Sequence, residues 1–345
     1  MAKLRRLNGL YWSSCPDSEL VARLAGDGAS LVVDLTEGEC SYTVPPGVER
    51  LEYPIPNYSY KPFEDVLVNV LYPVAERLSR GEKVLVHCRG GIGRSGVTVA
   101  MLLGLLRGAS AEEVRRKLEP LGFQAESPSQ KLAFRWFFRA RDLVGAEWLR
   151  SFVERLRRVG GGGNSYWDLY SHHASTVAGV AVDVLEAVSE RLRVSREDMA
   201  NAYAAGLLHD AGRVLAGDAV HHEVGARLAL EIRELAGCCD PNVVSKAVYH
   251  HRKRTDLLGD ATLRELGAGA QLVAAAVRLA DAFTDVYAGW DDYSRTGCYR
   301  GAELGGSRLI LVLECSPPSW LERRLAEKAE AFTKLTGIEV ELEVP

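Results

Sequence analysis

Residues 84–96 read V-L-V-H-C-R-G-G-I-G-R-S-G, and this stretch decides the fold of the first half of the chain. Three apolar residues precede a glycine-rich turn, and a mostly apolar run to residue 106 follows it. This order predicts a buried strand, a tight loop and then a helix. Glycines let consecutive backbone amides turn inward at the positive end of that helix, so the loop is expected to bind a phosphate-sized anion.

The residue types in this loop predict phosphoryl transfer. Cys88 opens the loop, where inward amides favour the thiolate, which is the nucleophilic form of cysteine. The planar guanidinium of Arg94 can hold two phosphoryl oxygens, and Ser95 can donate a hydrogen bond to the departing sulfur. No cofactor is expected at this site. The catalytic candidates are His87, Cys88, Arg94 and Ser95, and the candidates for phosphate binding are Arg89, Gly90, Gly91, Ile92, Gly93 and Arg94.

The pattern His-Cys-x5-Arg-Ser, between a strand and a helix, resembles the phosphate loop of cysteine-dependent protein tyrosine and dual-specificity phosphatases. The similarity covers roughly residues 5–143. It implies an α/β domain with a mostly parallel central sheet and helices on both faces. It also implies hydrolysis through a phosphocysteine, with a phosphorylated protein or a small phosphoester as substrate.

The chain departs from this family at the general acid. An aspartate of the family precedes the long helix, and Asn57 occupies that position here. An amide cannot donate a proton as an acid, and general acids contribute typically ~10²–10⁴ in rate. Leaving groups of low pKa, such as those of phosphotyrosine or of an RNA 5'-triphosphate end, are therefore favoured. Glu37, Glu39 or Asp65 could replace the acid, and Gln130 matches a position that orients water in related enzymes.

The rest of the first half supports a mostly parallel sheet, because short β-rich segments alternate with helical ones. The expected strands are 10–12, 31–33, 50–53 and 84–87, and the expected helices are 18–24, 63–78, 94–106, 111–118, 130–144 and 147–159.

A run of four glycines at 160–163 marks the expected domain boundary. Residues 1–163 carry 23 basic and 19 acidic side chains, net +4, whereas residues 164–345 carry 19 and 27, net −8. The two halves therefore differ in charge as well as in pattern. The expected division is a phosphatase domain at 1–159, a linker at 160–164, a helical domain at 165–290 and a small α/β extension at 291–345.

The second half predicts an all-α core that binds metal. Helical periodicity dominates it, and strands are expected only at 309–313 and 338–344, on either side of the last helix. Seven of the eight histidines lie here, mostly in pairs, and imidazoles with carboxylates on successive helices suit divalent ions. The relevant segments are His172-His173, His209-Asp210, His221-His222, His250-His251 and Asp281.

This order resembles the HD superfamily of metal-dependent phosphohydrolases over roughly residues 165–290. The resemblance implies one or two divalent ions, of Mn, Fe, Mg or Ni, and a nucleotide as a candidate substrate. His222 fits the family better than His221 because Gly225 and Ala226 follow it, and Arg213 matches a cation near the substrate phosphate. The implied ligands are His173, His209, Asp210, His222, His250, His251 and Asp281.

Three hypotheses follow. The leading one is a cysteine-dependent phosphatase fused to an active HD phosphohydrolase. In the second, the first domain only binds phosphate, impaired by Asn57, and the HD domain is the sole enzyme, acting on a nucleotide. In the third, the phosphatase is active and the HD domain is a non-catalytic sensor.

Composition excludes several other classes. The chain is 47% hydrophobic and 26% charged, with a net charge of −4 and no basic stripe typical of general nucleic-acid binding. Its longest apolar run, 96–106, is too short for a membrane span, and a cytoplasmic location is expected. Seven cysteines without a CxxC pair argue against a disulfide framework and a thiolate zinc site.

Overall fold

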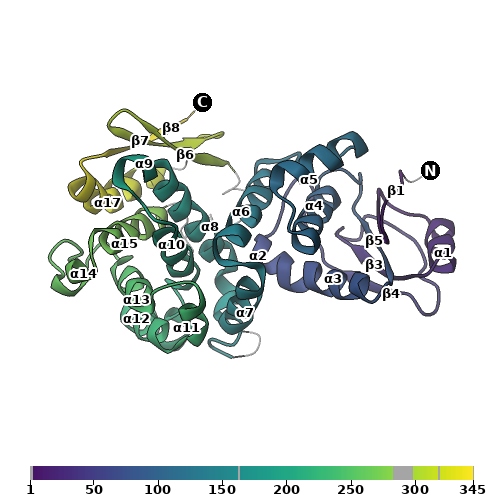
Figure 1. Ribbon diagram of the computed structural model, residues 1–345, viewed down its shortest axis with the longest axis horizontal. Coiled ribbons are helices and arrows are strands. Elements are labelled where there is room, and N and C mark those ends of the chain that lie inside the picture. Colours follow the sequence, from purple (N-terminus) through teal and green to yellow (C-terminus); the bar gives the residue numbers. More distant parts are fainter. Residues whose placement is uncertain (1–2, 162–163, 283–297, 318, 345) are drawn as a thin grey trace. The chain divides into compact units, whose positions relative to one another are not determined.

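The computed structural model describes residues 3–161, 164–282, 298–317 and 319–344. The chain divides into two compact units, Met1–Arg139 and Ala140–Pro345 (Figure 1). The division comes about twenty residues before the glycine run, so helix α7 (Ala146–Leu156) lies in the second unit. The reason is packing: the apolar face of α7 is buried, and the Trp148 indole donates to the Glu234 carbonyl at 2.6 Å.

The first unit contains a five-stranded sheet of order β1-β2-β5-β3-β4. Only β1 runs antiparallel to its neighbour, so the predicted mostly parallel sheet is confirmed. Asn8 and Gly9 both have positive φ and form the two-residue turn between β1 and β2. The strands are β1 (Arg5–Leu7), β2 (Leu10–Ser13), β3 (Ala29–Asp34), β4 (Glu49–Glu52) and β5 (Lys83–His87).

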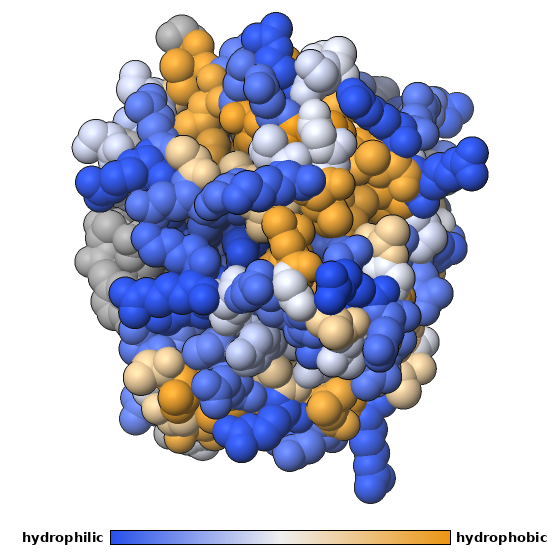
Figure 2. Space-filling model, turned by 90° about the vertical axis from the view of Figure 1, so that its left-hand side faces the viewer, coloured by the Kyte–Doolittle hydropathy of each residue, from blue (hydrophilic) through white to orange (hydrophobic). Residues whose placement is uncertain are grey.

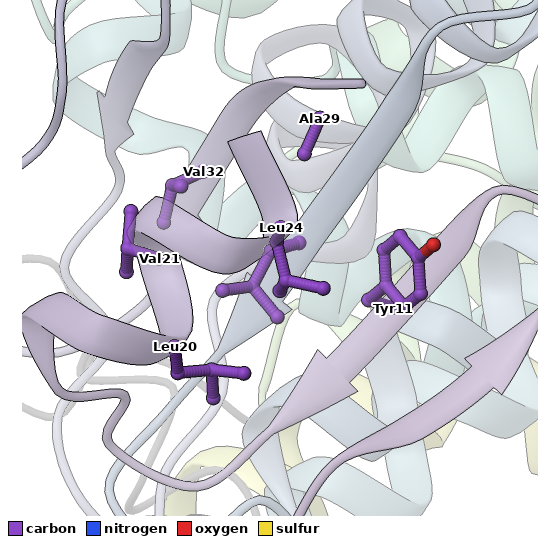
Figure 3. Close-up of a cluster of buried hydrophobic side chains, with 7 residues drawn as sticks. Tyr11, Leu20, Val21, Leu24, Ala29 and Val32 are labelled. Carbon is purple, nitrogen blue, oxygen red and sulfur yellow. The ribbon is translucent and has the colours of Figure 1, made fainter. Parts of the chain in front are cut away.

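Helices cover both faces of this sheet (Figure 1). Because side chains alternate along a strand, Val32 and Leu85 face α1, whereas Val33 and Val86 face the opposite helices. Figure 3 shows side chains of α1 packed on the sheet in the cluster Tyr11, Leu20, Val21, Leu24, Ala29, Val32 and Leu85. The helices are α1 (Ser18–Gly26), α2 (Phe63–Val66), the π-turn η1 (Leu67–Leu71), α3 (Tyr72–Ser79), α4 (Arg94–Arg107), α5 (Ala111–Leu118), the 3-10 turn η2 (Glu119–Leu121) and α6 (Pro128–Val144).

The second unit has a helical core, as predicted. Its helices α8 and α10 cross closely at Gly206, where a Cβ would lie 2.5 Å from the Cα of Ala178. The part of the predicted helical domain 165–290 beyond residue 282 lies outside the described residues. The elements are α8 (Tyr166–Ala187), α9 (Ser189–Leu192), α10 (Arg196–Leu208), α11 (Arg213–Ala216), α12 (His221–Glu231), the 3-10 turn η3 (Arg233–Gly237), α13 (Pro241–His250), α14 (Ala261–Glu265) and α15 (Ala268–Ala280).

The small α/β extension at the end of the chain is also present. Strand β7 (Arg308–Leu313) pairs antiparallel with β6 (Tyr299–Gly305) and parallel with β8 (Glu339–Glu343). Helix α17 (Ser319–Thr336) connects the two parallel strands and packs against α15. Strand β6 was not expected from the sequence. No helix among the described residues is long and apolar enough to cross a membrane.

The expectation of no disulfide framework is wrong for this structure, which pairs six of the seven cysteines. The pairs are Cys15–Cys40, Cys238–Cys239 and Cys298–Cys315, and Cys88 is free. Cys15 follows β2 and Cys40 follows β3, so two of these residues meet because parallel strands end at the same sheet edge. A search for close CxxC spacing cannot detect such a pair.

Candidate active site and metal centre

The free Cys88 lies at the carboxyl edge of the sheet, directly after β5. Its side chain is buried, with 2% exposure. The Gly91 amide donates to the Cys88 sulfur over 3.2 Å, and the Ser95 hydroxyl lies 3.2 Å from the same atom. Helix α4 begins at Arg94, so its positive end faces the loop. The sulfur therefore lies beside two polar groups at the amino-terminal end of α4.

Close packing explains the glycines of the loop. Gly91 has a φ of +68°, and a Cβ there would lie 2.4 Å from the Ser14 nitrogen. Its carbonyl accepts hydrogen bonds from Arg5 Nη1 at 2.7 Å and from Trp12 Nε1 at 2.9 Å. Only glycine fits this position, and two donors from the neighbouring strands fix the loop in place.

Arg94 is buried below the loop, with 2% exposure. Its Nη1 donates to the Ile55 carbonyl at 2.7 Å, and its Nη2 donates to Glu39 at 2.8 Å and to the Asn57 carbonyl oxygen at 3.1 Å. Two loops therefore orient the guanidinium. Asn57, at the position expected for the acid, serves as an acceptor for Arg94.

His87 precedes the nucleophile and is fully buried. Its Nε2 lies 2.7 Å from the Tyr42 hydroxyl and 3.7 Å from Asp34. Burial lowers the pKa of His87 from 6.5 to about 4, against the opposing effect of Asp34. The ring is therefore neutral at pH 7 and lies at the end of β5, where it contacts Tyr42 and Asp34.

Acidification is expected to destabilise the chain through His87. The unfolded imidazole takes up a proton below pH 6.5, whereas the folded one stays neutral to about pH 4. This stabilisation is complete above pH 6.5 and is lost as the pH falls, by about 3 kcal/mol at pH 4. Denaturant unfolding between pH 7 and pH 4 should show a steeper loss for the wild type than for His87→Asn. Equal slopes would contradict this role of His87.

The other residues considered for proton transfer lie in different surroundings. Asp65 accepts a hydrogen bond from the Tyr53 hydroxyl, and Glu37 is exposed on the loop after β3. Glu39, two residues later in that loop, contacts Arg94. Among the three carboxylates proposed from the sequence, Glu39 is the one whose described contacts include the loop arginine, Arg94.

The buried Gln130 lies against the loop, as a Cβ on Gly93 would come within 2.6 Å of its Oε1. The same Cβ would lie 2.4 Å from a carboxylate oxygen of Glu126, which the sequence analysis missed. Glu126 stands in no recognisable motif, so only the folded chain could have identified it. Arg89 is largely exposed and lies 3.9 Å from Glu39.

Two groups of side chains in the second unit could each hold a metal ion. The first is His173, His209 and Asp281, and the second is Asp210, His221 and His251. Asp210 lies between the groups. Its Oδ1 is 3.1 Å from His221 Nε2, and its Oδ2 is 3.5 Å from His173 Nε2. The imidazole and carboxylate donors of each group would suit a divalent ion, and Asp210 has an oxygen atom near each group.

The hydrogen bonds of the imidazoles fit metal ligation. Three rings point Nδ1 at a backbone carbonyl, so Nδ1 carries the proton and the neutral ring presents a lone pair at Nε2. Facing Nε2 atoms are 3.0 Å apart for His221 and His251, where lone pairs repel unless a cation lies between them. Burial lowers the pKa of His173, His209 and His251, which favours this neutral state. The carbonyl contacts are His209 to Gly206 at 2.8 Å, His221 to Asp218 at 2.7 Å and His251 to Val248 at 2.6 Å.

Two of the implied ligands differ from the structure. His221 joins the second group in place of His222, whose ring is half-buried beside Tyr249. His250 lies outside both groups and contacts Asp260 at 2.9 Å. Successive helical residues point about 100° apart, so one member of each doublet faces the ions. The remaining implied ligands, His173, His209, Asp210, His251 and Asp281, come together.

Three cations surround the two groups. Arg213 forms an ion pair with Asp210, with its Nε 2.7 Å from Asp210 Oδ2, at the position the resemblance implied. Lys328 and Arg324, both from α17, contact Asp281. The sequence analysis missed these two residues because they lie more than 40 positions beyond Asp281, in a segment whose role was unreadable.

Comparison with protein families finds a separate match for each of the two units. Residues 9–141 match the family model described as Swiss Army Knife protein, DSP-PTPase phosphatase domain, and residues 170–285 match the HD domain. No curated protein matches the chain. The HD domain implies divalent metal binding, consistent with the two groups of ligands.

Several solved structures resemble the first unit. Tk-PTP in the active form is 32% identical, over 40% of this chain and 96% of its own, with a TM-score of 0.35. Human DUSP28 is 19% identical, over 40% and 94%, with a TM-score of 0.37. P. aeruginosa TpbA is 22% identical, over 44% and 89%, with a TM-score of 0.33. On the family matches, residues 9–141 are a dual-specificity-type tyrosine phosphatase domain and residues 170–285 are an HD domain, and the chain is an enzyme.

Proposed function

We propose that the first unit hydrolyses aryl phosphates through a phosphocysteine. The observation that carries this proposal is the Cys88 sulfur, which faces the Gly91 amide and the Ser95 hydroxyl beside the buried Arg94. The loop would bind the phosphate of a phosphorylated protein or of a small phosphoester. Phosphotyrosine fits best because its phenolate is a better leaving group than the alkoxide of an alkyl phosphate and so depends less on the acid.

The reaction has two steps. In the first, the Cys88 thiolate attacks phosphorus, an S–P bond forms, and the P–O bond to the aryl oxygen breaks. Arg94 and the loop amides stabilise the charge on the non-bridging oxygens. In the second, water attacks phosphorus, the S–P bond breaks, and phosphate leaves. Ser95 donates a hydrogen bond to the departing sulfur, and Gln130 lies where it could orient the water.

Glu39 is the proposed proton donor to the leaving oxygen, taking the place of an acid at position 57. Replacing it with glutamine should lower turnover of phenyl phosphate by about 100-fold and that of p-nitrophenyl phosphate by less than tenfold. A poor leaving group needs the proton, whereas nitrophenolate does not. Steady-state kinetics on both substrates measure this difference.

Glu37→Gln is the matched control, because it removes an exposed carboxylate from the same loop. Equal losses on the two substrates for Glu39→Gln would show that Glu39 acts only by orienting Arg94. A larger and selective loss for Glu126→Gln would assign the proton to that residue instead.

The second unit is proposed to be a metal-dependent phosphohydrolase acting on a nucleotide. Divalent ions held by the two groups would supply a hydroxide at neutral pH and neutralise phosphate oxygens. His221 and His251 are oriented by backbone carbonyls, and Arg213 would contact the substrate phosphate. The mixed imidazole and carboxylate donors would suit Mn, Fe, Mg or Ni.

A substrate panel with and without chelator tests the pair of activities. Hydrolysis of p-nitrophenyl phosphate should resist chelation, because Cys88 needs no metal. Hydrolysis of nucleotides should stop on chelation and return with added metal. Chelator-sensitive turnover of both would leave the HD domain as the sole enzyme, and no metal-dependent turnover of any nucleotide would make that domain a sensor.

A further inference from the structure

A strongly basic pocket opens beside the two metal-binding groups. Its volume is about 290 Å³, and His251 and Asp281 form part of its wall. At ~30 Å³ per water, this equals roughly ten waters, which is room for two or three phosphoryl groups. The cations that line it are Arg213, Arg252, Lys253, Arg254, Arg324 and Lys328.

The positive charge of this pocket is local. Two carboxylates, Asp281 and Glu327, line it against six basic side chains. Residues 164–345 as a whole carry a net charge of −8, so the composition of this region does not explain the cluster. Figure 2 shows one side of the molecule, where hydrophilic side chains predominate between apolar patches. A concentration of one charge in a concave site favours a ligand of opposite charge.

Two of the cations come from the C-terminal extension, beyond the HD match that ends at residue 285. Lys328 on α17 is 7% exposed, and it contacts the Asp281 carboxylate and donates to the His251 carbonyl at 3.4 Å. Arg324, one turn earlier, donates to the Asp281 carbonyl at 2.7 Å. Burying a lysine costs free energy unless a partner or ligand holds its charge. The extension thus contributes directly to the pocket wall beside His251 and Asp281.

Other cations on the rim are less engaged. Arg252 lies 3.4 Å from the exposed Asp218, and Lys253 pairs with Glu327. Arg254 is exposed, and no ion pair of this residue is described within the residues that the structure covers. One ligand phosphate would satisfy only part of this array, whereas a chain of phosphates could reach several cations at once.

We propose that this pocket binds a linear oligophosphate of at least two phosphoryl groups, and that α17 supplies Arg324 and Lys328 to hold it. The inference rests on the function proposed for the second unit and deepens it, because one end of the bound oligophosphate would lie beside the metal-binding groups. The ligand is a triphosphate chain, carried either by a nucleoside triphosphate or by an inorganic oligophosphate. The C-terminal extension is then part of the binding site.

Calorimetric titration of the full chain tests the proposal. The experiment uses protein as purified, without added metal, in an Arg94→Ala background that weakens the anion site of the first unit. Inorganic triphosphate should bind about tenfold more tightly than orthophosphate, and salt should weaken it. Arg324→Glu should weaken triphosphate binding by at least about tenfold.

Arg323→Glu is the matched control, because it makes the same charge change one position away on α17, outside the pocket. It should change binding less than about twofold. Arg254→Glu, which leaves Asp281 untouched, should weaken triphosphate about fivefold and guards against a folding effect at Arg324. Equal effects of Arg323→Glu and Arg324→Glu, or equal affinities for triphosphate and orthophosphate, would overturn the proposal.

Comparing two ligands decides whether the pocket recognises an inorganic oligophosphate or the triphosphate of a nucleotide. Equal affinities for inorganic triphosphate and a nucleoside triphosphate indicate that only the phosphates are recognised, and tighter binding of the nucleotide indicates a base or sugar contact. Binding that follows this pattern without any metal-dependent hydrolysis would retain the pocket and reject the catalytic role. Metal-dependent hydrolysis of nucleotides that is unchanged by Arg324→Glu and Arg254→Glu would retain the catalytic role and reject the pocket as the phosphate-binding site.

Discussion

Replacing Cys88 with serine is expected to reduce turnover of p-nitrophenyl phosphate on the order of 10⁴-fold or more. The hydroxyl is similar in size to the thiol but far less ionised at neutral pH, so the first step loses its nucleophile. Phosphate binding should survive, because the Gly91 amide and Arg94 remain in place. Burst and steady-state kinetics with the aryl ester measure the loss.

The control for this variant lies in the second unit of the same chain. Metal content and metal-dependent hydrolysis should be unchanged by Cys88→Ser, and thermal unfolding should stay within a few degrees. Aryl phosphate turnover that persists and resists chelator would rule out the phosphocysteine. Turnover that persists but stops with chelator would move the aryl activity to the HD domain.

Replacing Asp210 with alanine is expected to lower metal affinity by more than about 100-fold. The loss should exceed the ~10–100-fold caused by removing mere supporting contacts of a ligand, since Asp210 contacts residues of both groups. Metal-dependent nucleotide hydrolysis should fall with it. Metal analysis of the purified protein and titration with Mn²⁺ measure the effect.

Glu197→Ala is a suitable control, because it removes an exposed carboxylate from α10, the helix that leads to Asp210. It should leave metal content unchanged. Aryl phosphatase activity should be unaffected in both variants. If Asp210→Ala retains two equivalents of metal, the two groups are not the metal centre.

Much of the first unit could be predicted from the sequence, because its elements are set by local patterns. The alternation of β-rich and helical segments requires a mostly parallel sheet, since neighbouring parallel strands need crossover connections. The loop after Val86 combines strand, glycines and helix within 13 residues, so Cys88, Arg94 and Ser95 are brought together by short-range geometry. The hairpin at Asn8-Gly9 carries a turn signal that the sequence analysis overlooked.

The sequence predicted which types of residue form the metal centre, but only some of the individual residues. Histidines on successive helices indicate ligands, but the sequence does not give the rotation of each helix about its axis. A family spacing selected His222, and the resemblance implied both His250 and His251, whereas the packing of α12 and α13 turns His221 and His251 toward Asp210. Each difference is a single residue, or about 100° on a helix.

By itself, then, the sequence determined the alternation of strands and helices in the first unit, the nucleophilic loop and the presence of a helical core with metal-binding residue types. These features depend on neighbours in the chain. Only the tertiary structure placed Glu39 on Arg94 and Lys328 on Asp281, across separations of 55 and 47 residues. Contacts of that kind depend on how helices and loops pack against one another, and packing between distant segments has no local signal in the sequence.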